Sequence, residues 1–121
     1  MTVAIWAGVV LLGGVGAVLR FIVDRTVSSR LAGPFPFGTF VVNLSGAMVL
    51  GFVGGLALPP HVALLAGTAL IGSYTTFSTW MLETQRLTEE RQVRPAVVNI
   101  VASVTLGLAA AWLGQRLGAQ L

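Results

Sequence analysis

A dense group of hydroxyl side chains lies inside an otherwise apolar segment of this sequence. In the stretch GSYTTFSTW (residues 72–80), the hydroxyl-bearing residues are Ser73, Tyr74, Thr75, Thr76, Ser78 and Thr79. The apolar run VALLAGTALI precedes them without a charged residue between. Such hydroxyls can donate hydrogen bonds to an anion, or they can bond the carbonyls of their own helix. The stretch therefore either lines a polar path or belongs to a helix whose hydroxyls bond its own backbone carbonyls.

The composition indicates a membrane protein. Hydrophobic residues make up 55% of the chain, charged residues only 9%, and the mean hydropathy is +0.89, beyond the range of soluble domains. A helix that crosses a bilayer needs about 20 mostly apolar residues, and four runs meet this at about 3–23, 39–58, 62–82 and 96–113. We therefore predict an all-α membrane protein with a single four-span domain over residues 1–121. The first run lacks the basic start of a signal peptide, so we expect it to be a retained span.

The residue content argues against several kinds of site. The chain has no cysteine, which excludes disulfides and thiolate metal sites. Its one histidine, His61, stands beside Pro60 without a nucleophile, so an enzyme is not expected. The sequence pI is about 11.2, but the basic residues are all arginines at span ends and in loops. There they suit anionic lipid headgroups better than nucleic acid.

Polar residues of all four spans are expected at a similar depth. Four spans place both termini on one side of the membrane and the loops 24–38 and 83–95 on the other. Arg20, Asn43 and Asn99 then lie about one helical turn inside the loop side, and Ser103 lies one turn further in. Polar groups within hydrocarbon usually face a bundle interior or a water-filled cavity. The coincidence favours a polar pathway; the alternative is that these side chains only join helices.

Small residues predict how the spans pack and where the third span could be interrupted. Four-residue spacing is found in the second span at Ala47, Gly51 and Gly55, and in the fourth span at Gly107 and Ala111. In the first span, Gly13, Gly14 and Gly16 form a cluster. Such faces let helix backbones approach closely in lipid. In the third span, Gly72 and the residues after it favour an interrupted helix, with an intact helix as the alternative. Carbonyls freed by an interruption would need a partner such as a cation.

Four segments of the chain resemble the Fluc fluoride channels, also called CrcB proteins. The matching segments, in order, are GGVGAVLRF (13–21), PFGTFVVNLSGAMVLG (36–51), GSYTTFSTWMLE (72–83) and NIVASVTLG (99–107). The resemblance extends over essentially the whole chain. It implies an antiparallel, dual-topology homodimer with a break in the third helix and two pores. Such a channel exports fluoride passively through the bacterial inner membrane and reduces fluoride toxicity.

The resemblance also implies roles for individual residues. Asn43 matches the pore asparagine of the family and Phe77 its first pore phenylalanine, while Trp80 stands at the position of the second. Gly72 and Thr75 match the residues whose backbone carbonyls hold a structural sodium ion at the dimer interface. The remaining matches to the pore and its polar lining are Arg20, Ser78, Thr79 and Ser103.

The chemistry of fluoride suits these assignments. The ion is small and strongly hydrated, so donors such as the Asn43 amide and hydroxyls must offset its dehydration. Aromatic ring edges carry partial positive charge, and Phe77 could offer its edge without trapping the ion. The chain also departs from the family pattern, because Asn99 stands where some relatives carry a tyrosine and Gly107 where a hydroxyl would be expected.

The sequence allows more than one membrane orientation and more than one function. The loop side carries most of the arginines, whereas Arg116 alone lies on the side of the termini. Because arginine favours the cytoplasmic side, the bias allows a heterodimer with an oppositely oriented homologue as an alternative to the homodimer. The alternative functions are a small dual-topology proton-coupled multidrug exporter and an assembly subunit without transport activity. The exporter would need a carboxylate within a span, and Glu83 lies only at the end of the third one.

Overall fold

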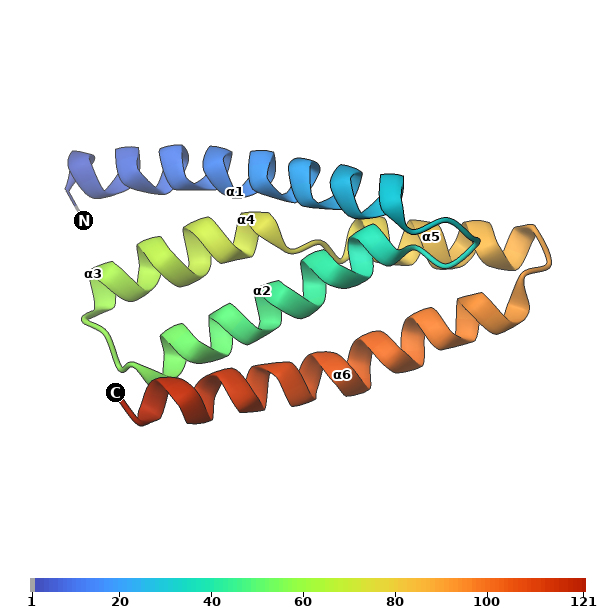
Figure 1. The fold of residues 1–121 in the computed structure, drawn as a ribbon. Coiled ribbons are helices and arrows are strands. Elements are labelled where there is room, and N and C mark those ends of the chain that lie inside the picture. The colour runs from blue at the N-terminus through green and yellow to red at the C-terminus, as the bar shows by residue number, and fades with distance from the viewer. Residues whose placement is uncertain (1) are drawn as a thin grey trace.

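The computed structural model describes residues 2–121 and consists of helices joined by short connections (Figure 1). Three spans are continuous helices: α1 (Val3–Arg30), α2 (Phe37–Gly55) and α6 (Val93–Ala119). The remaining span comprises α3 (Pro60–Ala63), η1 (Leu64–Ile71), α4 (Gly72–Tyr74) and α5 (Ser78–Glu89). All four are long and apolar enough to cross a membrane, which confirms the prediction of an all-helical, multi-pass membrane protein.

The third span changes its geometry along its length. After the first turn, η1 is a π-helix, in which the Gly72 N–H bonds the Gly67 carbonyl five residues earlier. Helix α4 then ends at Tyr74, and Thr75 has an extended backbone with φ −79° and ψ 160°. Helix α5 begins at Ser78. Residues 75–77, between α4 and α5, are called the non-helical segment below.

The helices extend beyond the apolar runs that define the predicted spans. Helix α1 continues to Arg30 and α6 begins at Val93, because polar turns can continue a helix outside the hydrocarbon. Helix α2 ends earlier than residue 58: Ala57 adopts a left-handed φ of 52°, and two prolines follow.

The two ends of the molecule carry different connections. In Figure 1 both termini and the turn between α2 and α3 lie at one end, which we call the terminal end. The α1–α2 and α5–α6 connections lie at the other, which we call the loop end. This arrangement agrees with the sidedness expected for four spans, so Asn43, Thr76 and Asn99 belong to the half of the molecule nearer the loop end.

Helices α2 and α6 pack closely through glycine in the half nearer the terminal end. A Cβ atom at Gly51 would collide with the Ala111 carbonyl, and one at Gly55 with the Gln115 carbonyl. Reciprocally, a Cβ atom at Gly114 would collide with the Met48 carbonyl, and one at Gly118 with the Phe52 carbonyl. Both backbones therefore approach each other at positions where only hydrogen occupies the side-chain site.

The glycine predictions were right for only some positions. Gly51, Gly55 and Ala111 lie in the α2–α6 contact, and Gly16 lets α1 approach Leu70 and Ser73. Gly107, Gly13 and Gly14 were expected in tight contacts, but no atom lies within 4 Å of a Cβ atom built on them. The glycine face of α6 consists of Gly114 and Gly118 instead, because four-residue spacing alone does not say which side of a helix meets its neighbour.

Candidate functional site

The side chain of Asn43 on α2 is joined to the backbone of the non-helical segment. Its Nδ2 donates to the Thr76 carbonyl at 2.8 Å, and its Oδ1 accepts from the Thr76 N–H at 2.8 Å. Both bonds have good length for an amide. Asn43 thereby replaces the intrahelical partners that Thr76 would have in a continuous helix. One hydrogen on Nδ2 remains for another acceptor, since an amide carries two.

Side chains that bond the backbone N–H groups after α4 leave two backbone carbonyls without their usual donors. In a continuous helix the Gly72 carbonyl would accept from the Thr76 N–H, which is bonded to Asn43. The Thr75 carbonyl would accept from the Thr79 N–H, which bonds the Thr76 hydroxyl at 3.2 Å. Carbonyl oxygens released in this way at unwound helix ends are ligands for sodium in membrane proteins. The predicted pair, Gly72 and Thr75, therefore fits the chemistry of a hard cation site.

Two aromatic rings lie where the non-helical segment meets α5: Phe77 is the last residue of the segment, and Trp80 belongs to the first turn of the helix. Phe77 is 70% exposed, an unusual fraction for a phenylalanine next to buried Thr76. Its ring and the Trp80 ring are 5.7 Å apart between centroids and inclined at 80°. In such an edge-to-face pair the positive rim of one ring meets the negative face of the other. The two predicted pore aromatics thus form one unit at the start of α5.

Trp80 is also linked to α6 by hydrogen bonds. Its indole Nε1 donates to the Asn99 carbonyl at 3.1 Å. The Asn99 Nδ2 donates to the Thr84 Oγ1 at 2.9 Å, and that hydroxyl donates to the Trp80 carbonyl at 2.9 Å. Asn99 is fully buried. Thr84 was missed by the sequence interpretation, although its position one turn after Trp80 was a usable signal.

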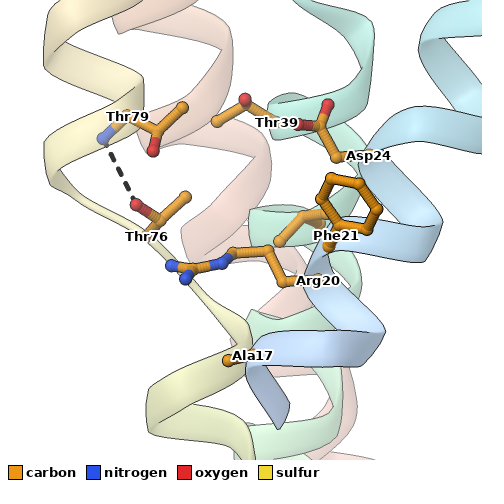
Figure 2. A pocket seen from close by; sticks show the side chains of 8 residues that line it. Ala17, Arg20, Phe21, Asp24, Thr39, Thr76 and Thr79 are labelled. Atoms are coloured by element: carbon orange, nitrogen blue, oxygen red, sulfur yellow. Dashed lines mark hydrogen bonds between the residues drawn. The ribbon is translucent and has the colours of Figure 1, made fainter. Parts of the chain in front are cut away.

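A cavity of about 180 Å³ lies between α1, α2 and the start of α5. Its lining residues are Ala17, Arg20, Phe21, Asp24, Thr39, Val42, Thr76 and Thr79. Figure 2 shows Arg20 extending across the cavity toward Thr76, whereas Asp24 lies beside Thr39. Within residues 2–121 the one salt bridge joins Arg86 and Glu90, so Arg20 and Asp24 line the same cavity without a direct ion pair despite their four-residue spacing. The cavity therefore combines one guanidinium, one carboxylate and several hydroxyl groups.

A carboxylate lies close to this cavity. Thr39, which is only 2% exposed, donates its hydroxyl hydrogen to the Glu83 Oε1. The sequence interpretation placed Glu83 at the end of the third span and gave neither residue a role. Glu83 is half-buried and lies within α5, since that helix continues to Glu89. The contact joins α2 to α5 one turn from Asn43.

The other predicted residues lie in different surroundings. Thr79 lines the cavity with Arg20, whereas Ser78 is exposed at the start of α5. On α6 the Ser103 Oγ is buried and, among the described residues, has no hydrogen-bond partner; the same holds for the Asn99 Oδ1. The chain thus brings Arg20, Asn43 and Thr79 together around Thr76, and Trp80 joins Asn99 of α6 to Phe77. What role each side chain plays stays a prediction.

Comparison with known proteins gives a consistent result over the length of the chain. The family model for "CrcB-like protein, Camphor Resistance (CrcB)" matches residues 7–115. A protein of Mycolicibacterium paratuberculosis named fluoride-specific ion channel FluC 2 is 69% identical over 116 residues, covering 96% of this chain and 95% of that protein. The protein of that name in Mycobacterium tuberculosis is 67% identical over 95% of this chain and 91% of its own length. The protein of Leifsonia xyli named fluoride-specific ion channel FluC 1 is 43% identical over 98% of this chain and 89% of its own length.

Proposed function

The chain belongs to the CrcB family, and we propose that it is a fluoride-selective channel through which fluoride leaves the cytoplasm passively. The observation that carries this proposal is the high identity, over nearly the full length, to relatives named as fluoride-specific ion channels. The family is therefore one of ion channels and not of enzymes. The bacterial inner membrane is the location that this function requires.

The entry of the ion into the protein is proposed to begin at the cavity around Arg20. Among the described residues Arg20 forms no direct salt bridge, so its guanidinium is available to attract an anion even though Asp24 lines the same cavity. The Thr76 and Thr79 side chains line this space as well. The remaining hydrogen on Asn43 Nδ2 is a further donor beside it. Several weak donors in succession suit conduction better than one strong site, because the ion must also leave.

The path then continues along the aromatic pair and α6. Phe77 presents a largely exposed ring, and ring edges attract an anion without a fixed charge. The Ser103 hydroxyl has no partner among the described residues and is free to donate to an ion or a water molecule. We assign Ser78 to the polar lining as well, on the strength of its exposure beside Phe77.

We propose that two chains form an antiparallel dimer with two pores. The exposed aromatic Phe77 and the open side of Gly72 would be covered by the second chain, and sodium would bind the Gly72 and Thr75 carbonyls at that interface. When bound, sodium supplies the positive charge that the released carbonyls lack. The Thr76 N–H donates to the Asn43 side chain and the Thr79 N–H donates to the Thr76 hydroxyl, which keeps those carbonyls free of intrahelical donors.

The orientation of the two chains can be tested separately. The loop end carries Arg25, Arg30, Arg86, Arg91 and Arg94, which by the charge rule would favour one orientation. Single cysteines placed in the connection 90–92 should nevertheless react with impermeant reagents from both sides of the membrane. Labelling from one side only would contradict dual topology and favour a heterodimer with an oppositely oriented homologue.

The function itself is tested by fluoride efflux from liposomes that contain the purified protein. An ionophore dissipates the voltage, a fluoride electrode follows the efflux, and chloride is the control ion. We expect fast fluoride loss without chloride loss, and its abolition in Phe77→Ile. The matched variant Trp6→Ile changes another exposed aromatic residue, far from the site on α1, and should conduct normally. Absence of fluoride flux from the folded wild-type protein would refute the proposal.

A further inference from the structure

Trp80 lies in a closed set of hydrogen bonds that joins α5 to α6. The indole Nε1 bonds the Asn99 carbonyl, the Asn99 side chain bonds Thr84, and the Thr84 hydroxyl returns to the Trp80 carbonyl. The distances are 3.1, 2.9 and 2.9 Å. We call this set the Trp80 lock. The Thr84 hydroxyl both accepts and donates in this set, so its two bonds strengthen each other.

The Trp80 lock determines which part of the indole can meet an ion. An indole has one hydrogen-bond donor, its Nε1–H. Here that donor is used by a carbonyl on α6, next to the fully buried Asn99 side chain. The carbon rim and the faces of the ring remain, and the ring stands nearly perpendicular to that of Phe77. Fixing the indole therefore also fixes the neighbour against which Phe77 packs.

We infer that Asn99 and Thr84 are positioning residues of the anion path, which hold Trp80 so that it acts through its ring rim and not through its N–H group. This inference rests on the proposed fluoride conduction. It gives the tryptophan the same electrostatic role as a phenylalanine ring, with the larger indole anchored to α6. The Asn99 side chain serves the anchor, and it does not bind the ion.

The N–H bond can be observed directly by nuclear magnetic resonance. The chain has three tryptophans, so the full-length protein labelled with ¹⁵N in the indole gives three separate signals, and Trp80→Phe identifies one of them. We expect the Trp80 signal to exchange slowly with deuterium and to stay in place when sodium fluoride replaces sodium chloride. A shift of this signal with fluoride would show that the N–H group binds the ion and would overturn the inference.

Variants of Thr84 test whether the Trp80 lock matters for transport. Thr84→Val keeps the side-chain shape but removes the hydroxyl, so we expect at least about fivefold faster indole exchange and about fivefold to tenfold slower fluoride efflux, the factors that one or two lost hydrogen bonds give. Thr84→Ser should restore both. Thr88→Val is the matched control, since its hydroxyl bonds only the Thr84 carbonyl one turn earlier.

The outcomes separate this inference from the proposed function. If Thr84→Val exchanges rapidly at the indole but conducts like the wild type, the positioning role is refuted while fluoride conduction stands. If the wild-type protein conducts no fluoride, the proposed function fails, and the exchange measurement still reports whether the Trp80 lock exists. Trp80→Phe provides a second check: it keeps a ring rim but loses the N–H bond to α6, so efflux should slow at least as much as in Thr84→Val without being abolished. Wild-type efflux in Trp80→Phe would show that the anchor is not needed, and complete loss would show that the ring rim is not sufficient; either result would contradict the inference.

Discussion

The terminal end and the loop end of the molecule are held together by different kinds of contact. Near the terminal end, α2 and α6 approach through Gly51, Gly55, Gly114 and Gly118. Within residues 2–121 no side-chain hydrogen bond joins these two helices. Near the loop end, the contacts of α2 and α6 with the third span are polar: Asn43 bonds the non-helical segment, and Asn99 bonds Thr84.

The glycine contact holds two helices together, whereas the polar contacts shape the candidate site. Close glycine packing gains dispersion over many atoms and leaves no polar group to satisfy, so it forms a rigid frame in lipid. Hydrogen-bonded side chains specify individual backbone groups, and here they hold residues 75–77 out of a helix. The frame near the terminal end thus keeps α2 and α6 in place while their other halves position the candidate site.

The largest expected effect comes from filling the glycine contact. Gly114→Leu would drive a side chain into the backbone of α2 at Met48, and overpacking of this kind costs about 3 kcal/mol. Thermal unfolding in detergent, followed by size-exclusion chromatography, measures the loss. Gly107→Leu, on the same helix, meets no atom within 4 Å and should change stability by less than about 0.5 kcal/mol. Equal losses of stability in both variants would show that the destabilisation does not come from the contact between α2 and α6.

A smaller effect is expected at the polar half of α2. Asn43→Leu keeps the approximate volume but removes both bonds to Thr76, with a cost of about 2 kcal/mol for two net hydrogen bonds. Fluoride efflux should fall at least about tenfold, because the non-helical segment loses its partner and the path loses a donor. Thermal unfolding and liposome efflux give the two values. Wild-type values for both would remove Asn43 from the site.

Removal of sodium should have a still smaller effect. At a sodium concentration about ten times its Kd, exchange for choline at equal ionic strength should lower stability by about 1.4 kcal/mol. In Asn43→Leu the Thr76 N–H is free to bond the Gly72 carbonyl, so the sodium dependence should weaken. Unfolding curves of both proteins in the two salts test this coupling. Sodium dependence that is unchanged in the variant would argue against the Gly72 carbonyl as a ligand.

The smallest effect on stability is expected for Ser103→Ala. The hydroxyl is buried without a partner among the described residues, so its removal should leave stability within about 0.5 kcal/mol of the wild type. Fluoride efflux should still fall, because the path loses a donor. A normal rate of efflux with unchanged stability would place Ser103 outside the ion path.

Much of the architecture follows from the sequence alone. The apolar runs are long enough to predict four spans, and their even number places both termini at one end. The ordered segments around Arg20, Asn43, Phe77 and Ser103 were sufficient to indicate the family. The number of spans, the side on which the termini lie and the family depend on the composition, length and order of segments along the chain, which can be read from the sequence.

The tertiary structure decided which groups meet. Gly107 and Gly114 each follow a leucine on the same helix, yet of the two only Gly114 faces α2. The Trp80 N–H and the Thr84 hydroxyl gained their roles from Asn99, which comes 15 residues after Thr84 in the chain and belongs to another helix. Helix rotation and the approach of neighbouring helices determine such contacts. A hydroxyl in a span can bond its own helix, so its type and position do not say whether it meets another element.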